Sequence, residues 1–218
     1  MSEGKAAPMK ESRSKSGIRK RWIGWTVLAL LAVVAVWLVF FWGVVRQSWT
    51  EEVELAPADV IVVERRMKFV KVYFELFRPG LQTRFSSLRL PDGARFETED
   101  RISLIWLGRG AAAGTWTLIA VANYCEEFRK YGLTDYVQLD YADGHWSHRP
   151  LEPEYFGRAA NLLVADRMAN DGALVTLGEK RDWNSETYGP DKRYLRIQRD
   201  QRDLDVQVKS CATGSKTN

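Results

Sequence analysis

The sequence predicts a mainly β protein, in which one N-terminal transmembrane helix is followed by an antiparallel β-sheet or sandwich-like extracytoplasmic domain with one or two short helices. Three observations predict this fold. Residues 22–45 carry no charge, apolar and polar residues alternate in short runs after residue 46, and turn-forming triplets separate these runs. The predicted organisation is a basic disordered cytoplasmic tail, a transmembrane helix, a β-rich domain and a mobile C-terminal tail, over residues 1–21, 22–45, 46–200 and 201–218.

The positive charge of the chain is concentrated in the N-terminal tail. The 218 residues carry a formal net charge of +4, but residues 1–21 hold seven Lys or Arg against two Glu, a local +5. The other 197 residues therefore carry −1 (+4 minus +5). A nearly neutral domain is a poor match for a polyanion, so we expect no nucleic-acid partner.

Residues 22–45 are long enough for a spanning helix. As an α-helix they measure about 36 Å, against a hydrocarbon core of roughly 30 Å. Tryptophans lie near both ends of the stretch, and their indole rings prefer the lipid headgroup level. They are Trp22, Trp25, Trp42 and Trp49. A buried core helix and a cleaved signal peptide are the alternatives. The run is too long for the latter and lacks a small-x-small site after it, which favours an uncleaved signal-anchor.

The charges on either side of this stretch predict its orientation. Arg19, Lys20 and Arg21 precede it, whereas only Arg46 follows closely. Because loops rich in Lys and Arg stay in the cytoplasm, the N-terminus is predicted inside and the domain outside. For a bacterial protein this means the inner membrane and the periplasm, with the lipid bilayer as the first expected partner.

Short strands are predicted along the rest of the chain. Val53 and Leu55 alternate with glutamates, and residues 70–76 place Val and Phe on one face; Arg78-Pro79-Gly80 is predicted to end that strand. Asp143-Gly144 predicts a tight hairpin. The predicted strands, in order, cover residues 53–55, 60–63, 70–76, 88–90, 102–107, 115–122, 136–141, 145–151, 174–177 and 194–197. Helical spacing is predicted at 126–131 and 154–168.

Cys125 and Cys211 are the two cysteines of the chain. On an oxidising side of the membrane they can form a disulfide. By lowering the entropy of the unfolded chain, this bond would stabilise the fold by roughly 4 kcal/mol. Two independent thiols, one buried and one exposed, remain the alternative. No CxxC or recognisable Cys–His pattern predicts a catalytic thiol.

Other chemical signals are weak. His145 and His148 fall on opposite faces of a predicted strand, so we expect no metal site, and no motif predicts a cofactor. Residues 108–114 (GRGAAAG) lack the Lys-Ser/Thr of a phosphate-binding loop. The acidic pairs Asp140/Asp143 and Glu152/Glu154 leave open an alternative function, an enzyme acting on an envelope polymer or lipid with carboxylates and stacking aromatics.

Aromatic and arginine residues gather in one part of the domain. Such side chains anchor protein interfaces, although a β-domain core with cross-strand aromatic pairs explains the same pattern. The interface candidates are Tyr124, Phe128, Arg129, Tyr131, Tyr136, Tyr141, Trp146, Arg149, Tyr155 and Arg158.

The stretches WTEEVEL (49–55) and FGRAANLL (156–163), together with the single N-terminal span, resemble a group of uncharacterised bacterial membrane-anchored proteins. The resemblance implies a compartment and an architecture, and it carries no activity. With no catalytic constellation, the sequence predicts a non-enzymatic binding or assembly module of the envelope. Such a module would be an accessory subunit of a complex or an inhibitor or immunity-type protein, with another membrane or periplasmic protein as its partner.

Overall fold

The computed structural model describes residues 25–35, 44–75, 78–132, 134–165, 169–189, 194–199 and 211. The chain divides into two compact units, Met1–Gly43 and Val44–Asn218. In the first unit, residues 25–35 form an exposed helix. Within the described part of the chain, no helix combines the length and apolar character needed to cross a bilayer.

Most of the predicted span, the predicted N-terminal tail and all of the predicted C-terminal tail except Cys211 lie outside the described residues. This holds for residues 1–24, 36–43, 201–210 and 212–218. The last two residues of the predicted helix, Val44 and Val45, belong instead to the first β-strand, where they pair with Val70 and Phe69. That boundary of the sequence prediction was wrong, because the antiparallel partner strand satisfies the backbone there.

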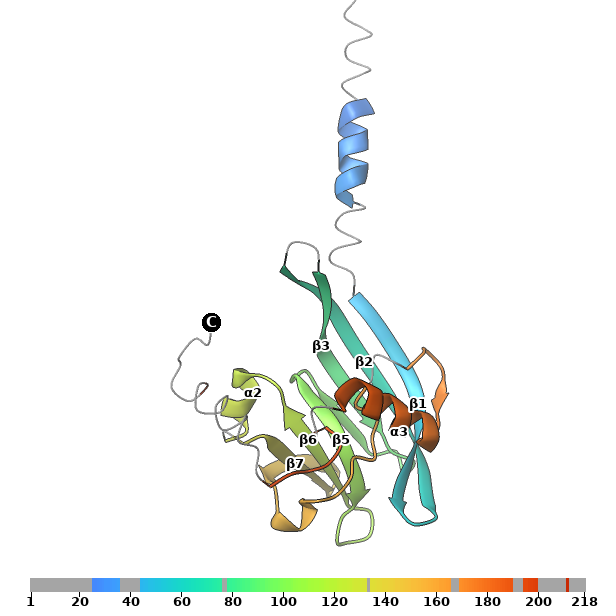
Figure 1. The fold of residues 1–218 in the computed structure, drawn as a ribbon, viewed down its shortest axis with the longest axis vertical. Helices are drawn as coiled ribbons and strands as arrows, with labels where there is room; N and C mark the ends of the chain where they lie inside the picture. The colour runs from blue at the N-terminus through green and yellow to red at the C-terminus, as the bar shows by residue number, and fades with distance from the viewer. Residues whose placement is uncertain are drawn as a thin grey trace, which may run out of the picture. The chain divides into compact units, whose positions relative to one another are not determined.

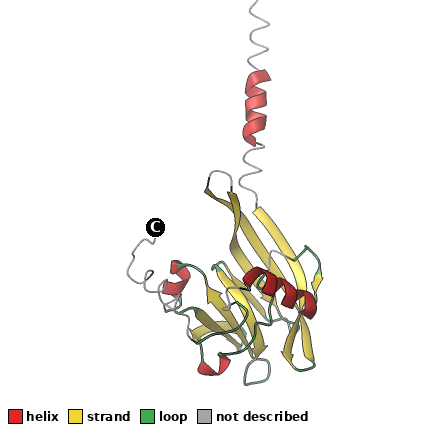
Figure 2. Cartoon of the chain, in the orientation of Figure 1, coloured by secondary structure: helices red, strands yellow, loops and turns green. Residues whose placement is uncertain are grey.

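The second unit is built of two sheets, as predicted for a mainly β domain (Figures 1 and 2). One has strand order β4-β3-β2-β1-β9 and the other β5-β6-β7-β8; every pairing is antiparallel except β1 with β9. The strands are β1 Val44–Ala56, β2 Asp59–Glu75, β3 Arg78–Arg89, β4 Arg95–Thr98, β5 Ile102–Arg109, β6 Trp116–Ala122, β7 Tyr136–Ala142, β8 His145–Pro150 and β9 Leu174–Val175. The helices are α2 Cys125–Lys130, η1 Pro153–Tyr155 and α3 Leu177–Tyr188.

The core is formed where the two sheets face each other. Alternation in β1 turns Trp49, Glu51 and Val53 inward, and one half of this inner face packs on the second sheet through Val53, Val63 and Leu88. The other half, with Trp49, packs against the segment after residue 162 and against α3. The outer face of the second sheet is covered by residues 155–164 and 194–197.

The hairpin turn predicted from Asp143-Gly144 is present. Asp143 and Gly144 both have positive φ (52° and 84°), as a two-residue type I′ hairpin requires. Residues 91–93 turn between β3 and β4, with Gly93 at φ 92°. The helix predicted at 126–131 is present as α2, which covers Cys125–Lys130.

The turn predicted at Arg78-Pro79-Gly80 is a strand. These residues open β3 and pair with the end of β2, for example Pro79 with Tyr73. β4 pairs with β3 only over 86–89, so at Pro79 the other side of β3 has no strand partner among the described residues. A missing N–H is tolerated at such an edge.

The helix predicted at 154–168 was wrong. Only η1 is helical there, Gly157 has φ 89°, and residues 166–168 lie outside the described part. The backbone is instead held extended by distant partners: Gly157 N donates to Ile197 O, and Ala160 N donates to Leu195 O. Tertiary hydrogen bonds have overridden the local helical spacing.

The end of the domain also differs from prediction. Residues 194–197 contribute one bridge, Ala159 with Arg196, and no named strand, and the strand predicted at 174–177 stops at Val175. α3 begins at Leu177 and was not predicted. Its signal is the capping box Thr176-x-x-Glu179, in which each side chain bonds the other's backbone N–H.

Candidate functional site

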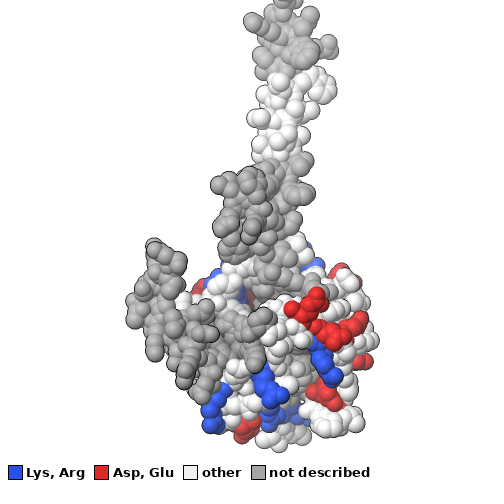
Figure 3. Space-filling view, viewed as in Figure 1, with Lys and Arg blue, Asp and Glu red and all other residues white. Residues whose placement is uncertain are grey.

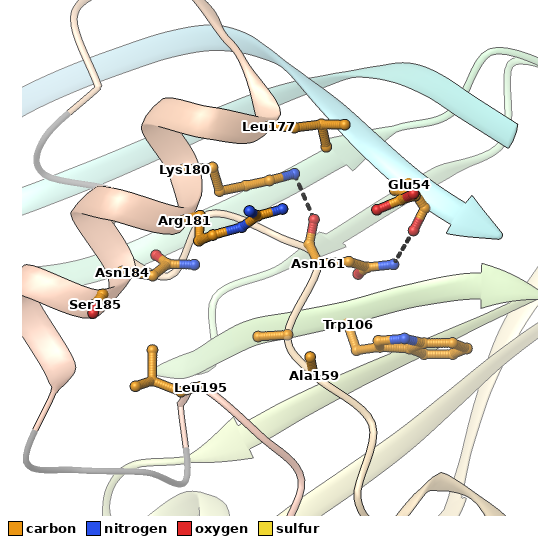
Figure 4. Close-up of a pocket in the computed structure, with 11 residues that line it drawn as sticks. Glu54, Trp106, Ala159, Asn161, Leu177, Lys180, Arg181, Asn184, Ser185 and Leu195 are labelled. Atoms are coloured by element: carbon orange, nitrogen blue, oxygen red, sulfur yellow. Dashed lines mark hydrogen bonds between the residues drawn. The ribbon is translucent and has the colours of Figure 1, made fainter. Parts of the chain in front are cut away.

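A cleft of about 490 Å³ lies between α3, the end of β1 and the segment 159–161. Figure 4 shows its lining side chains, which come from elements far apart in the sequence. They belong to Glu54, Trp106, Ala159, Ala160, Asn161, Leu177, Lys180, Arg181, Asn184, Ser185 and Leu195.

The cleft combines an apolar wall with a polar rim. Trp106 and Leu195 contribute apolar surface, and the exposed side chains of Arg181 and Ser185 stand along α3. In Figure 4 the Arg181 guanidinium extends from α3 toward Asn161. Arg181 forms no ion pair with any described residue. Beside its apolar surface the cleft therefore carries a cation, Arg181, and the exposed carboxylate of Glu54, and neither forms an ion pair with a described residue.

Lys180 lies behind this rim, buried to 4% exposure. Its Nζ donates to Asn161 O at 2.5 Å and to Glu52 O, and lies 3.8 Å from Glu51 Oε2. Desolvation lowers the pKa of Lys180, while the nearby Glu51 carboxylate acts in the opposite direction. All these contacts join α3 to β1 and to the segment 159–161, so Lys180 is a structural cation of the cleft wall.

Glu51 is the anion of this buried cluster. Its side chain is fully buried; Oε1 accepts from Arg65 Nη1 at 3.0 Å and Oε2 accepts from Leu163 N at 2.7 Å. The Arg65 guanidinium is also buried and lies 5.4 Å from the Trp49 ring. The Glu51 carboxylate thus neutralises two buried cations, Arg65 and Lys180, and accepts a hydrogen bond from one backbone N–H.

Two asparagines hold the segment 161–165, which crosses between the sheets. Asn161 pairs with both backbone groups of Leu107 (2.8 and 2.7 Å) and donates to Glu54 O at 3.0 Å. Asn184 accepts from Val164 N and Ala165 N, both at 2.9 Å, and donates to Leu162 O. These amides satisfy backbone groups that have no sheet partner. The cleft wall is therefore rigidly held.

The buried polar side chains of the cleft wall are hydrogen-bonded to the backbone of their own chain. Lys180 and Asn184 are occupied by backbone carbonyls and N–H groups, and the exposed cation Arg181 has no base or nucleophile bonded to it. In the described part of the chain, no three His, Cys, Asp or Glu side chains gather so as to hold a metal ion. An apolar group that carries a carboxylate matches the cleft's wall and rim.

The aromatic candidates predicted from the sequence do not form one surface. Phe128, Tyr136 and Tyr155 are buried, with 1%, 4% and 7% exposure. Phe128 packs with Ala122 and Cys211, and Tyr155 packs on Trp106 at 5.3 Å between ring centroids. These three residues occupy core positions, as the alternative reading of the pattern predicted.

Of the remaining candidates, Tyr131, Tyr141 and Trp146 are partly buried against the core between the two sheets. Tyr141 and Trp146 stack across the β7–β8 hairpin at 5.2 Å, and Trp146 Nε1 donates to Arg95 O. Arg158 lies 5.0 Å from the Trp106 ring, on the outer face of the second sheet. Tyr124, Arg129 and Tyr131 belong to α2 and its two ends. On the viewed face, acidic and basic side chains occur side by side (Figure 3).

α2 carries the disulfide. Cys125 is bonded to Cys211 with 5.0 Å between Cα atoms, and Arg129 donates two hydrogen bonds to Cys211 O at 3.2 and 3.1 Å. Cys211 is buried. Arg129 therefore helps to hold a C-terminal residue and is not a free interface cation.

The acidic pairs and the histidines named from the sequence lie in the β7–β8 hairpin and directly after it. Asp140 and Glu152 both pair with Arg149, and Asp140 also accepts from Thr117 Oγ1 at 2.8 Å. The pKa of Arg149 is raised, chiefly by its hydrogen bond to Asp140. His145 is exposed, and His148 meets the ring of Tyr131 edge-on at 5.3 Å. Arg149, itself an interface candidate, is thus a partner for carboxylates of its own chain.

At the end of α2, Asp100 accepts hydrogen bonds from Lys130 and Tyr131. Desolvation raises the pKa of Asp100, but these bonds outweigh it and the net pKa is lowered. An acid with a lowered folded-state pKa stabilises the fold above the unfolded value, about 3.9, and loses that contribution as the pH falls through the folded value.

We therefore expect the free energy of unfolding of Asp100→Asn to fall less than that of the wild type as the pH is lowered from neutral to 3. Urea unfolding of both proteins between neutral pH and pH 3 measures this difference, with the exposed Asp143→Asn as control. Parallel curves for wild type and Asp100→Asn would contradict the assignment.

Sequence reasoning missed Lys180, Arg181 and Asn161 as cleft residues. The Thr176-x-x-Glu179 box would have located α3 and with it the first two. Nothing local in the sequence places Asn161 beside α3, because its partners Leu107 and Glu54 lie 54 and 107 residues away. Compared with protein-family models, curated proteins and solved structures, the chain shows no match.

Proposed function

We propose that the chain is a membrane-anchored binding or assembly module of the bacterial envelope, with its N-terminus in the cytoplasm and its β domain in the periplasm. The uncharged stretch 22–45 and the basic residues before it support the anchor and its orientation. A disulfide between Cys125 and Cys211 fits an oxidising compartment.

The proposed binding site is the cleft beside α3. Its buried polar groups are used in holding the wall, whereas Arg181 at the rim has no acidic partner among the described residues and lines the same cleft as Trp106 and Leu195. An exposed arginine beside apolar surface is typical of interface anchors. The ligand we propose is an extended segment of a membrane or periplasmic protein, with an apolar side chain next to a carboxylate.

The convergence of Asp140 and Glu152 on Arg149 argues against the enzyme alternative. Both carboxylates are already hydrogen-bonded to one arginine side chain of their own chain. The binding role is therefore the better supported of the two.

Photo-cross-linking in native membranes tests the proposal. A photoreactive amino acid replaces Ser185 at the cleft rim in the full-length chain, and membranes are washed at alkaline pH before illumination. We expect the chain to stay in the membrane and to form a discrete adduct. The adduct should be lost with Arg181→Glu and largely kept with Arg181→Lys, which preserves the charge.

A probe at Ser147, exposed on β8 at the other edge of the second sheet, is the positional control. Equal labelling from Ser147 and Ser185, or insensitivity to Arg181→Glu, would exclude the cleft as the binding site. Release of the chain by the alkaline wash would exclude the anchor.

A further inference from the structure

A second cleft, of about 430 Å³, opens on the outer face of the first sheet. In β1 and β2 the buried side chains, among them Trp49 and Phe69, belong to the core, so the residues between them face outward. The cleft is lined chiefly by such residues of β1, β2 and β3, strands that lie side by side (Figure 1), and by Asp171 in the loop before β9. It shares no lining residue with the cleft beside α3.

Two cations stand opposite each other in this cleft. Arg46 of β1 and Lys68 of β2 are cross-strand partners in the register, and neither side chain forms an ion pair or a hydrogen bond with any described residue. Directly opposite side chains of an antiparallel pair have their Cβ atoms about 4.5–5.5 Å apart, where like charges destabilise the sheet. An anion held between the two side chains would remove this repulsion.

The carboxylates of the same cleft already have other partners. Glu64 Oε1 accepts a hydrogen bond of 2.7 Å from Arg66 Nε, and Glu64 Oε2 lies 3.8 Å from Arg89 Nη1. Asp171 accepts from the backbone N and the Oγ of Ser48, at 2.8 and 2.9 Å. Together with the cross-strand pair, four basic side chains and two carboxylates lie in or beside the cleft, which leaves a net charge of +2 (4 − 2).

This excess charge indicates the kind of anion that fits. A phosphate monoester carries about −1.5 to −2 at pH 7 and offers three acceptor oxygens, whereas a carboxylate or a phosphodiester carries a single charge. A planar guanidinium and a lysine ammonium on neighbouring strands can contact different oxygens of one phosphate. Phe85 of β3, which is half-buried and pairs with Lys68, adds apolar surface on the same face. The volume of the cleft lies within the range of roughly 300–1,000 Å³ that is typical of small-molecule sites.

We propose that this cleft binds the phosphate monoester of a small organic molecule. The phosphate would lie between the Arg46 guanidinium and the Lys68 ammonium, and the organic part would lie against Phe85. A monoester is preferred to an acidic peptide because only a dianion balances both cations. The inference goes beyond the proposed function and does not rest on it, since the two clefts have no residue in common.

Isothermal titration calorimetry of the full-length chain in a neutral detergent tests this site. The probes are three soluble anions that share a phenyl ring: phenyl phosphate, diphenyl phosphate and benzoate. We expect saturable one-to-one binding of phenyl phosphate, and binding of the two monoanions weaker by about tenfold or more, the cost of one charge-assisted contact. The affinity for phenyl phosphate should also fall between about pH 7.5 and 5.5, because the second pKa of a phosphate monoester is about 6, whereas the affinity for benzoate should not fall.

Arg46→Gln and Lys68→Gln should each weaken the binding of phenyl phosphate by about tenfold or more. Each substitution removes one member of a like-charge pair, so neither should lower the urea midpoint of unfolding. Arg84→Gln is the matched control. Arg84 is exposed on β3 next to Phe85 but does not line the cleft, so its loss should leave the affinity nearly unchanged.

The inference is overturned if phenyl phosphate does not bind saturably at millimolar concentration, if benzoate binds equally well, or if Arg84→Gln weakens binding as much as Arg46→Gln. A fourth probe, dihexanoyl phosphatidic acid, separates the two sources of a monoester. If this probe alone binds, the ligand is a lipid headgroup and the small-molecule assignment is wrong. Cross-linking from Ser185 in the other cleft should be unaffected by Arg46→Gln, so the failure of either proposal leaves the other standing.

Discussion

Glu51→Gln is expected to destabilise the β domain by about 3–5 kcal/mol, the cost of removing one partner from a buried ion pair. The substitution preserves shape, removes the charge that balances Arg65 and Lys180, and replaces one of the two acceptor oxygens with an N–H donor. Both cations are nearly inaccessible, with side-chain exposures of 2% and 5%. Arg65 depends on Glu51 particularly, because its Nε has no hydrogen-bond partner in the described structure.

Urea unfolding of the full-length protein in detergent, followed by tryptophan fluorescence, measures this effect. Glu54→Gln is the matched control: it is three residues further along β1, its side chain is exposed, and its change should stay within about 0.5 kcal/mol. A deficit for Glu51→Gln no larger than that of the control would show that the buried cluster contributes nothing to the fold.

The pH dependence of the Glu51→Gln deficit gives a second criterion. Desolvation already lowers the pKa of Lys180, and without Glu51 this pKa falls further. A base with a lowered folded-state pKa gives a stability that rises with pH between its folded and unfolded values, the latter about 10.4. The deficit of Glu51→Gln should therefore shrink toward pH 10, whereas the control should show no such recovery.

The β strands could be predicted because alternation and turn residues are local signals. Val53 and Leu55 among glutamates predicted β1, and Asp143-Gly144 predicted the β7–β8 hairpin, whose positive φ angles the structure shows. Glu51 shows the limit of that pattern. It stands at an inward position of β1, yet a lone acid in a strand gives no local sign that Arg65 and Lys180, 14 and 129 residues away, will neutralise it.

The cleft was beyond prediction for the same reason. Residues 154–168 have helical spacing, but the backbone of this region is held extended by Ile105, Leu195 and Ile197. Hydrophobic periodicity predicts how a segment packs if it forms a regular helix or strand. It does not predict an irregular segment whose backbone is hydrogen-bonded by a distant side chain such as Asn184. Clustering of aromatic residues along the sequence likewise did not distinguish core from surface: Phe128 is buried and Tyr124 is 41% exposed.

Breaking the disulfide is expected to lower the free energy of unfolding by about 4 kcal/mol, since the bond closes a loop spanning 86 residues. That is a large part of the roughly 5–15 kcal/mol by which domains are stable. The bond also fixes a buried contact, because Cys211 packs with Ala122 and Phe128. Urea unfolding of the full-length protein with and without reductant measures the loss.

The double variant Cys125→Ser/Cys211→Ser is the control for this measurement. It should unfold at the urea concentration of the reduced wild type and should not respond to reductant, because both lack the constraint on the unfolded chain. If the oxidised and reduced wild type unfold at the same urea concentration, the bond does not contribute to the stability of the domain. If thiols in protein from native membranes react with a maleimide without prior reduction, the bond is not formed there, and the periplasmic placement loses one of its two supports.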